Sequence, residues 1–419
     1  MAADNIMDMN LNTNLNTNIL NTNISAEKLQ MKQQIQAHLD QVILPFWEAL
    51  KDDEYGGFYG YMDIDLNLDK RAVKGCILNN RILWFFSNAY LTVKRPKLLS
   101  YAKHAYEFLK HACLDRTCGG VYWSVTFDGK PEEDMKHTYN QAFAIYALSS
   151  YYDASGDREA LDIAWSIYNV IETHCKDDKG YLEAFDRKFE PVSNEKLSEN
   201  GVMAEKTMNT LLHVVEGYTE LYRVTKDNRV GQNLRWMLDI FAKKVYNPAK
   251  KRQEVFFDKD WNTLIDLYSY GHDIETSWLI DKGLAILDDS QVTKELAPIT
   301  DTLAEQIYQI AYRDHSVLNE CERGVDNNMR VWWIQAESVL GFFNYYQKHN
   351  EKTEYFKAAQ DIWDYIQNVM TDKRPGSEWF WELDENQKPS SKKPIVEPWK
   401  CPYHNGRMCF EMIYRLGEK

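Results

Sequence analysis

The chain has 419 residues, of which 44% are hydrophobic, and it carries a net charge of −14. An acidic chain without a basic run is not expected to bind nucleic acid, and no apolar stretch approaches the roughly 20 residues of a membrane-spanning helix. The 13 Trp, 26 Tyr and 17 Phe residues suffice for a large core. These features predict a soluble protein without a nucleic-acid or membrane partner, and they favour a small molecule as its ligand.

The first 24 residues differ in composition from the rest of the chain. They are dominated by Asn, Thr and Leu, and they lack the positively charged and apolar regions of a signal peptide. We predict that residues 1–24 form a disordered tail and that residues 25–419 form a single domain. The seven cysteines contain no CxxC pair. Such usage is typical of reduced thiols, so a cytoplasmic location is expected.

A short aromatic element recurs along the remaining chain at intervals of about 60 to 75 residues. Each copy has the pattern of a short strand or hairpin next to turn residues. The interval leaves room for two helices of ordinary length with their loops. The six copies are Gly56–Tyr61, Gly119–Trp123, Gly180–Phe185, Glu254–Phe257, Val317–Glu320 and Glu378–Glu382.

The segments between these elements have the patterns of helix pairs. Residues 141–148 are apolar on nearly every side, which is typical of a helix covered all round. By contrast, one stripe of an amphipathic helix is formed by Leu161, Ala164, Trp165, Tyr168 and Ile171. Six such pairs predict an all-α fold, an (α/α)6 barrel with short β-hairpins at one end. The alternative is an open solenoid of the same pairs, but its ends would need polar caps.

Polar and aromatic residues gather at equivalent positions of the six units, after each hairpin and at the start of the next inner helix. In a closed ring these positions converge on the axis at one end. Tryptophans stack on pyranose rings and planar polar groups bind hydroxyls, so the set favours a sugar. Trp332 and Trp333 point about 100° apart on a helix, and the sequence does not say which faces the cavity. The candidates are Arg81, Tyr139, Asn209, His213, His272, Glu275, Trp332, Trp333, Glu337, Trp399 and His404.

Two of the candidate histidines are suited to proton transfer. Histidine has the unperturbed pKa nearest neutrality, so His272 and His404 can take and return protons if they face one cavity. Glu275 lies one helical turn after His272, where it is placed to orient that histidine or to contact the ligand. A zinc site formed by His213, His272 and His404 is an alternative. Because the chain has no HExxH pattern, we expect no metal.

Seven segments of the chain are distinctive, namely Phe46–Gly60, Arg81–Trp84, Lys136–Tyr139, Lys206–Asn209, Ser269–Glu275, Arg330–Glu337 and Trp399–Arg407. Together they resemble the cellobiose 2-epimerases, within the N-acylglucosamine 2-epimerase superfamily. The resemblance extends from about Met31 to Arg415. It implies an (α/α)6 barrel and catalysis without a nucleotide, NAD or metal cofactor.

The resemblance also implies a reaction, which is epimerisation at C2 of the reducing-end glucose of β-1,4-linked disaccharides. Cellobiose, lactose and mannosyl-glucose are the expected substrates, and the protein is expected to be a monomer or a weak oligomer. We assign proton transfer on opposite faces of an enediolate to His272 and His404, after ring opening. Arg81 and His213 are expected to stabilise the oxyanion. The other candidates are expected to bind the sugar.

Three other functions fit parts of this pattern. An N-acylglucosamine 2-epimerase or a mannose isomerase would use the same scaffold on a monosaccharide, but the Trp399 segment is more like that of the disaccharide enzymes. An inverting glycoside hydrolase needs two carboxylates roughly 6.5–9.5 Å apart, and Glu275 and Glu337 are the only evident acids. A non-catalytic sugar-binding protein has no use for two proton-transfer histidines.

Overall fold

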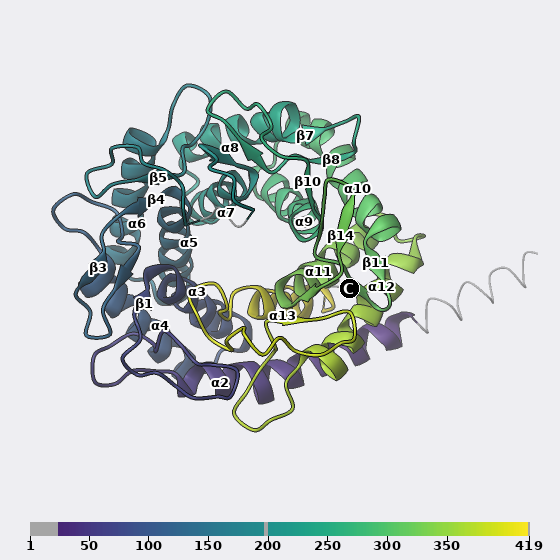
Figure 1. Ribbon diagram of the computed structural model, residues 1–419, viewed down its shortest axis with the longest axis horizontal. Helices are drawn as coiled ribbons and strands as arrows, with labels where there is room; N and C mark the ends of the chain where they lie inside the picture. The colour runs from purple at the N-terminus through teal and green to yellow at the C-terminus, as the bar shows by residue number, and fades with distance from the viewer. Residues whose placement is uncertain (1–23, 197–199, 418–419) are drawn as a thin grey trace, which may run out of the picture.

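The computed structural model describes residues 24–196 and 200–417, which form a closed ring of helices in two layers (Figure 1). The inner helices are covered on almost every side, and residues 138–151 of one of them are all buried. This explains their apolar sequences. Within the described residues the inner layer consists of α3 (Cys76–Val93), α5 (Thr138–Ser155), α7 (Met208–Thr225), α9 (Tyr270–Leu287), α11 (Trp332–Lys348) and α13 (His404–Arg415).

The outer helices bury one face against the inner layer. In the outer helix α6 (Arg158–Val170) and the turn after it, the predicted stripe faces the inner layer: Leu161, Ala164, Tyr168 and Ile171 are buried, and Trp165 is partly buried. The first outer helix comprises residues 24–38, the π-helical turn η1 (Leu39–Ile43) and α2 (Leu44–Ala49). The others are α4 (Pro96–Phe108), α6 (Arg158–Val170), α8 (Asn228–Ile240), α10 (Ser290–Ile310) and α12 (Thr353–Tyr365). Further π-helical turns are η2 (Leu109–Cys113), η3 (Ile171–Cys175), η4 (Phe241–Val245) and η5 (Ile366–Met370).

Short antiparallel strands join neighbouring units at one end of the ring. The strand before each inner helix pairs with the hairpin region of the next unit. These pairs are β1 (Lys74–Gly75) with β2 (Ser124–Val125), β4 (Lys136–His137) with β5 (Ala184–Phe185), β6 (Lys206–Thr207) with β9 (Phe256–Phe257), β10 (Leu267–Ser269) with β13 (Glu320–Glu322) and β15 (Arg330–Val331) with β16 (Glu382–Leu383). The remaining strands are β3 (Pro131–Glu133) beside β2, β14 (Val325–Asn327) beside β13, β7 (Tyr246–Asn247) with β8 (Arg252–Gln253) and β11 (Tyr312–Arg313) with β12 (Ser316–Val317).

The two ends of the described chain meet and close the ring. Met62 in the first unit pairs antiparallel with Val396 in the last, which continues the strand pattern of the other units. Trp379 donates a hydrogen bond from Nε1 to Nε2 of His38 at 2.7 Å, and α13 packs against both α3 and α11. The predicted (α/α)6 barrel is confirmed and the open solenoid is wrong. The predicted disordered tail lies, except for Ile24, outside the described residues.

Buried lysines fix the hairpins against the inner helices. Each lysine lies shortly before an inner helix, has a fully buried side chain and pairs with a carboxylate of a hairpin. A buried ion pair is weak evidence for stability, but loss of one partner leaves an uncompensated charge. These pairs therefore hold the geometry of the hairpin end. They are Lys74 with Asp52, Lys136 with Asp115, Lys206 with Asp177 and Lys400 with Glu378.

Two further predictions concern the whole chain. All seven cysteines are free thiols, as their spacing predicted. Among the helices of the described residues, none combines the length and the apolar character that crossing a lipid bilayer requires.

Candidate active site

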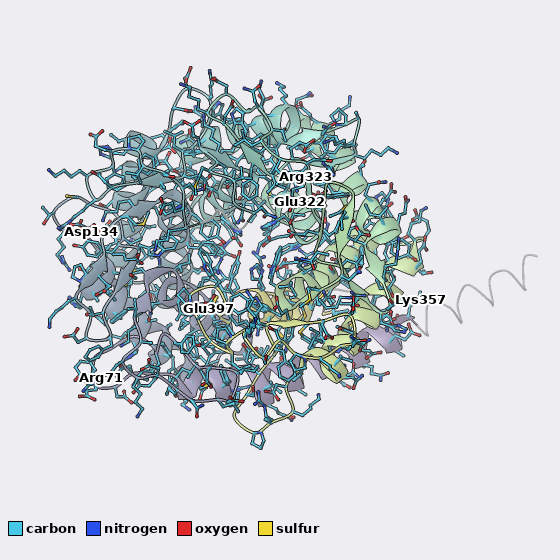
Figure 2. All side chains as sticks on the ribbon, viewed as in Figure 1. Arg71, Asp134, Glu322, Arg323, Lys357 and Glu397 are labelled. Atoms are coloured by element: carbon cyan, nitrogen blue, oxygen red, sulfur yellow. The ribbon has the colours of Figure 1, made fainter. Side chains whose placement is uncertain are left out.

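The predicted site residues lie at the hairpin end of the ring. They come from α3, α5, α7, α9, α11 and α13 and from the segment before α13. In the view down the ring axis, Glu322 of β13 and Glu397 of the segment before α13 lie nearer the centre than Arg71, Asp134 and Lys357, which lie at the rim (Figure 2). The hairpin and the C-terminal segment thus extend toward the axis at the end where the site is built.

An arc of aromatic and imidazole rings connects most of the candidates. Successive ring centroids along it are 4.6–6.1 Å apart. The arc joins residues that are far apart in the sequence, so it depends on closure of the ring. In order, its members are Trp399, Tyr139, His213, Tyr403, His404, Trp333 and His272.

The structure shows which of the two adjacent tryptophans belongs to this arc. The ring of Trp333 lies 4.9 Å from that of His272 and 5.3 Å from that of His404, and Trp333 remains partly exposed. Trp332 is only 1% exposed, and the Nζ atom of Lys400 lies 4.5 Å from its ring centroid. Trp333 therefore borders both proton-transfer candidates, whereas the buried ring of Trp332 lies 5.4 Å from that of His404 only.

Arg81 lies at the end of the arc formed by Trp399 and Tyr139. Its Nη2 donates to the hydroxyl oxygen of Tyr139 at 2.6 Å, and its guanidinium lies 4.3 Å from the ring centroid of Phe143. Because Tyr139 accepts this hydrogen bond, its own hydroxyl proton is available to a ligand. Asn209 is partly exposed, and among the described residues its Oδ1 has no hydrogen-bond partner. Both groups are suited to binding hydroxyls.

His213 is paired with a carboxylate that was not among the candidates. Its Nδ1 lies 2.9 Å from Oε2 of Glu216, one helical turn further along α7. Burial alone would raise the pKa of Glu216, but Arg407, His213 and Tyr403 lower it to about 2. The ionised carboxylate accepts a hydrogen bond from Nδ1–H of His213 and leaves Nε2 as the nitrogen that can exchange a proton.

His404 has a similar partner on a neighbouring helix. Its Nδ1 lies 2.7 Å from Oε1 of Glu337 and 3.8 Å from Oε1 of Glu275. Trp278 donates from Nε1 to the other oxygen of Glu337 at 2.9 Å, which fixes that carboxylate. This arrangement fixes the ring orientation of His404 and directs Nε2 away from the carboxylates.

His272 differs from the other two histidines because its partner is a hydroxyl. Its Nδ1 lies 2.7 Å from Oγ of Ser269, the residue before α9. Glu275 was expected to orient His272 or to contact the ligand. Its Oε1 instead accepts from Arg407, whose positive charge attracts it, and among the described residues its Oε2 has no partner. The orienting role predicted for Glu275 is thus taken by Ser269.

Burial sets the ionisation of these groups. It lowers the pKa of His272 to about 3, with a smaller contribution from the charge of His213. Burial, and then the cations Arg407 and Arg81, lower the pKa of His404 well below its usual value. Burial, and then repulsion by Glu337, raise the pKa of Glu275 to about 7. Both imidazoles are therefore neutral at pH 7 and can act as bases, while Glu275 titrates near neutrality.

Comparison with known proteins identifies the family. The profile of the N-acylglucosamine 2-epimerase family matches residues 56–405. A cellobiose 2-epimerase from Eubacterium cellulosolvens is 53% identical over 391 residues, which are 90% of this chain and 96% of that relative. The chain belongs to the N-acylglucosamine 2-epimerase family. It is a carbohydrate epimerase, as predicted, so the hydrolase and non-catalytic alternatives are wrong.

Solved structures agree with the family. The structure of a sugar epimerase from a ruminal bacterium is 48% identical, with a TM-score of 0.91 over 93% of this chain and 100% of that one. A cellobiose 2-epimerase from Bacillus thermoamylovorans is 44% identical, with a TM-score of 0.88 over 92% of this chain and 99% of that one. The ring of helices in this epimerase therefore has the same fold as the solved structures of these two related epimerases.

The positions of the histidines and carboxylates bear on the alternative of a zinc site in the epimerase. Among the residues that the structure describes, the group whose ligand atoms come together is Glu275, Glu337 and His404, within 4.8 Å, and not the three histidines of the zinc alternative. Arg407 donates to both carboxylates of this group. Its guanidinium offsets part of their charge and would repel a divalent cation, so the cluster is better suited to orienting His404.

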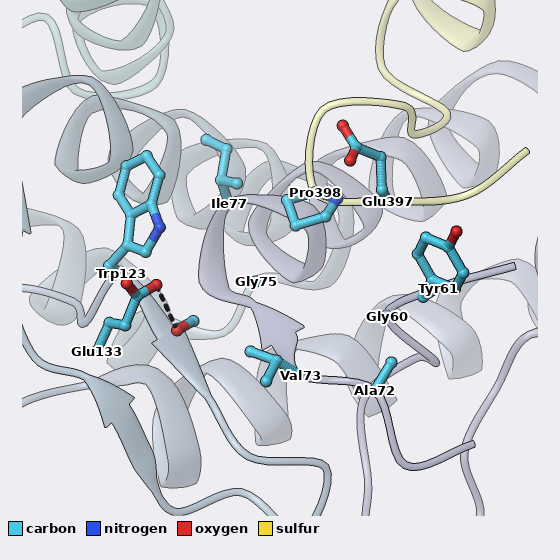
Figure 3. A pocket seen from close by; sticks show the side chains of 11 residues that line it. Gly60, Tyr61, Ala72, Val73, Gly75, Ile77, Trp123, Glu133, Glu397 and Pro398 are labelled. Carbon is cyan, nitrogen blue, oxygen red and sulfur yellow. Dashed lines mark hydrogen bonds between the residues drawn. The ribbon is translucent and has the colours of Figure 1, made fainter. Parts of the chain in front are cut away.

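A cavity of about 250 Å³ opens beside the outer end of the arc (Figure 3). Trp123 and Tyr61 lie on opposite sides of it, and Pro398 and Ile77 form part of its wall. The ring of Trp123 is 5.8 Å from that of Trp399. The cavity therefore continues the arc of rings outward from the histidines.

Gly271 allows the close approach of α9 and α11 beside His272, and this leads to a first prediction. A Cβ atom at Gly271 would lie 2.5 Å from the ring of Trp333 and from the side chain of Ile334. Gly271→Ala is therefore expected to displace Trp333 and to lower kcat/KM of the epimerase by about tenfold to a hundredfold. Steady-state kinetics and a thermal melt of the purified variant measure the effect.

The matched control lies on the same helix. At Gly283 an added Cβ would meet only Oγ1 of Thr219, at 3.3 Å. Gly283→Ala is expected to retain nearly full activity. Equal activity of the two variants would contradict the importance of the Trp333 position.

Proposed function

We propose that the epimerase inverts C2 of the reducing-end glucose in β-1,4-linked disaccharides. Cellobiose is then converted to 4-O-β-D-glucosyl-D-mannose and lactose to epilactose. The observation that carries this proposal is the placement of Trp333 against both His272 and His404, since it brings two neutral bases to one aromatic surface. The similarity to proteins named cellobiose 2-epimerase supports the choice of substrate.

The reaction requires the sugar ring to open first. The C2 proton of an aldose is acidic only when the C1 aldehyde can accept the resulting charge. A histidine that takes the proton of the O1 hydroxyl and delivers a proton to O5 breaks the C1–O5 bond and leaves the aldehyde. No atom is lost, so this step is a proton transfer within the bound sugar.

Proton removal and return then invert C2. One imidazole takes the C2 proton, the C–H electrons form the C1–C2 double bond of the enediolate, and O1 takes up the negative charge. The second imidazole delivers a proton to the opposite face of C2, and the charge returns from O1. We assign these two roles to His272 and His404, in an order set by the direction of the reaction. The product differs from the substrate only in configuration, so no oxidant or reductant is needed.

The other residues stabilise the charge and hold the sugars. Arg81 and His213 are proposed to stabilise the oxyanion at O1 and O2, where charge appears in the transition state. Tyr139 and Asn209 bind hydroxyls. The aromatic side chains Trp333 and Trp399 stack on the sugar rings, and the cavity beside Trp399 gives the non-reducing sugar room.

The experiment that tests the function combines a substrate assay with isotope exchange, and it is the second prediction. In deuterated water we expect one deuterium at C2 of the epimerised product, measured by NMR and mass spectrometry. Because two different bases act, deuterium is expected in the product well before it appears in unreacted substrate. A product free of deuterium would contradict proton transfer and would require a hydride route.

The competing function acts on monosaccharides. An N-acylglucosamine 2-epimerase or a mannose isomerase would prefer N-acetylglucosamine or mannose, and the isomerase would return the proton to C1 instead of C2. We therefore expect a higher kcat/KM for cellobiose and lactose than for either monosaccharide. The opposite order would replace the disaccharide proposal by the monosaccharide one.

A further inference from the structure

One guanidinium lies at the centre of the buried site and was not among the predicted residues. Arg407 is 1% exposed and lies one helical turn after His404 on α13. Its Nη1 donates to Oε1 of Glu216 at 2.5 Å and to the hydroxyl oxygen of Tyr403. Its Nη2 donates to Oε1 of Glu337 at 2.8 Å and to Oε1 of Glu275. A single side chain therefore joins three carboxylates from three inner helices.

Two of these carboxylates are the partners of the site histidines. Glu216 holds Nδ1 of His213 and Glu337 holds Nδ1 of His404. Arg407 thus connects the histidine assigned to charge stabilisation with one assigned to proton transfer. A guanidinium is suited to this place because its donors form a rigid planar fork that matches several carboxylates at once.

We propose that Arg407 is a positioning residue of the epimerase, which orients the carboxylate partners of His213 and His404 together and keeps them ionised. The inference rests on the proposed function, because it assigns Arg407 to the same proton-transfer site. Arg407 itself acts through the carboxylates and not on the sugar.

The charge balance of the site supports this role. Three buried carboxylates repel one another, and without a cation burial would favour their protonated forms. A protonated Glu216 or Glu337 is a weaker acceptor for Nδ1–H and can instead donate its own O–H to Nδ1, so the orientation and tautomer of the histidine are no longer fixed. The groups facing His404 are Arg407 and Tyr403 at α13, Glu337 on α11, Glu275 and His272 on α9, His213 on α7 and Arg81 on α3.

The direction of the pH effect follows from these neighbours. Arg407 lowers the pKa of Glu216, Glu275 and His404. Its removal raises all three pKa values, so a higher pH is needed to keep the carboxylates ionised and His404 neutral. The acidic limb of the kcat/KM profile is therefore expected to move to higher pH, by about one to three units.

The experiment compares two variants of Arg407 with a matched control, as the third prediction. Arg407→Met keeps much of the apolar volume and removes the charge, and Arg407→Lys restores the charge without the fork. We expect Arg407→Met to lower kcat about tenfold to a hundredfold with the shifted acidic limb, and Arg407→Lys to restore the pH limb in part. Arg415→Met, in the same helix and bonded to Glu411, is expected to keep the wild-type profile.

A second measurement does not depend on catalysis and separates this inference from the proposed function. Imidazole ¹⁵N NMR of the substrate-free protein reports the tautomer and pKa of each histidine. We expect the His404 pKa to be higher in Arg407→Met than in the wild type, even if cellobiose proves not to be a substrate. A folded Arg407→Met protein with unchanged His404 and His213 signals and an unchanged pH profile would overturn the proposal.

Discussion

His404→Gln and His272→Asn are each expected to lower kcat for epimerisation by about 10²–10⁴-fold, the usual contribution of a general acid or base. Each substitution keeps a hydrogen-bonding side chain of similar size and removes only the proton-transfer function. The dissociation constant for the disaccharide, measured by calorimetry, is expected to change little because Trp333 and Trp399 remain. Full activity of either variant would contradict the assignment of that histidine.

The two variants are also expected to differ from each other in a diagnostic way. A variant with one remaining base can still exchange the C2 proton of one epimer with solvent on its own face. We therefore expect one variant to exchange the glucose form and the other the mannose form, which NMR in deuterated water detects. Exchange of the same epimer by both variants would mean that the two histidines do not act on opposite faces.

A control histidine from the surface separates these effects from general losses. His315 has a 73% exposed side chain, pairs with Asp361 of the outer helix α12 and is not a member of the arc of rings. His315→Gln is expected to retain wild-type kcat and exchange behaviour. If this variant also lost activity, the falls in kcat of the other two histidine variants would have to be attributed in part to lower protein stability.

The ring fold could be predicted because its signals are local and repeated. The alternation of an all-round apolar helix with an amphipathic one appears in residues that are close in sequence, and it recurs in several units. The strand pairs that link the units were predicted only as hairpins. Their partners, such as Met62 and Val396, come from opposite ends of the chain, and no local pattern indicates that contact.

The candidate site could be predicted in its position but not in all its contacts. Equivalent places in a repeat must converge, and this placed the eleven candidates at one end. Glu216 and Arg407 were missed because their bond joins residues 191 positions apart. A usable signal did exist, since each lies one helical turn after a candidate histidine. Of the two roles expected for Glu275, the structure does not show the contact with His272, because a cation on another helix competes for its carboxylate.

Which tryptophan faces the cavity depends on the rotation of α11 about its own axis. That rotation is set by packing against α9 and α13, where Gly271 leaves space for Trp333. Adjacent residues on a buried helix look alike in sequence when neighbours cover both. The choice between Trp332 and Trp333 therefore follows from tertiary contacts alone.

Arg81→Met is expected to produce the second large effect, a fall in kcat of about 10²–10³-fold, as for other groups that stabilise an oxyanion. The methionine retains the packing against Phe143 and removes the positive charge and the hydrogen bond to Tyr139. Because the negative charge at O1 exists only near the transition state, KM is expected to change much less than kcat. Steady-state kinetics with cellobiose measure both constants.

The partner of Arg81 provides the control that distinguishes charge stabilisation from positioning. Tyr139→Phe leaves the guanidinium in place but removes the oxygen to which its Nη2 donates. If Arg81 acts directly on the oxyanion, Tyr139→Phe lowers kcat by only about tenfold and Arg81→Lys retains part of the activity. If Arg81 serves only to hold Tyr139, the two single variants and the double variant lose the same activity. That second pattern would assign the contact with the oxyanion to the phenol of Tyr139. A direct action of Arg81 on O1 instead requires Arg81→Met to lower kcat more than Tyr139→Phe does.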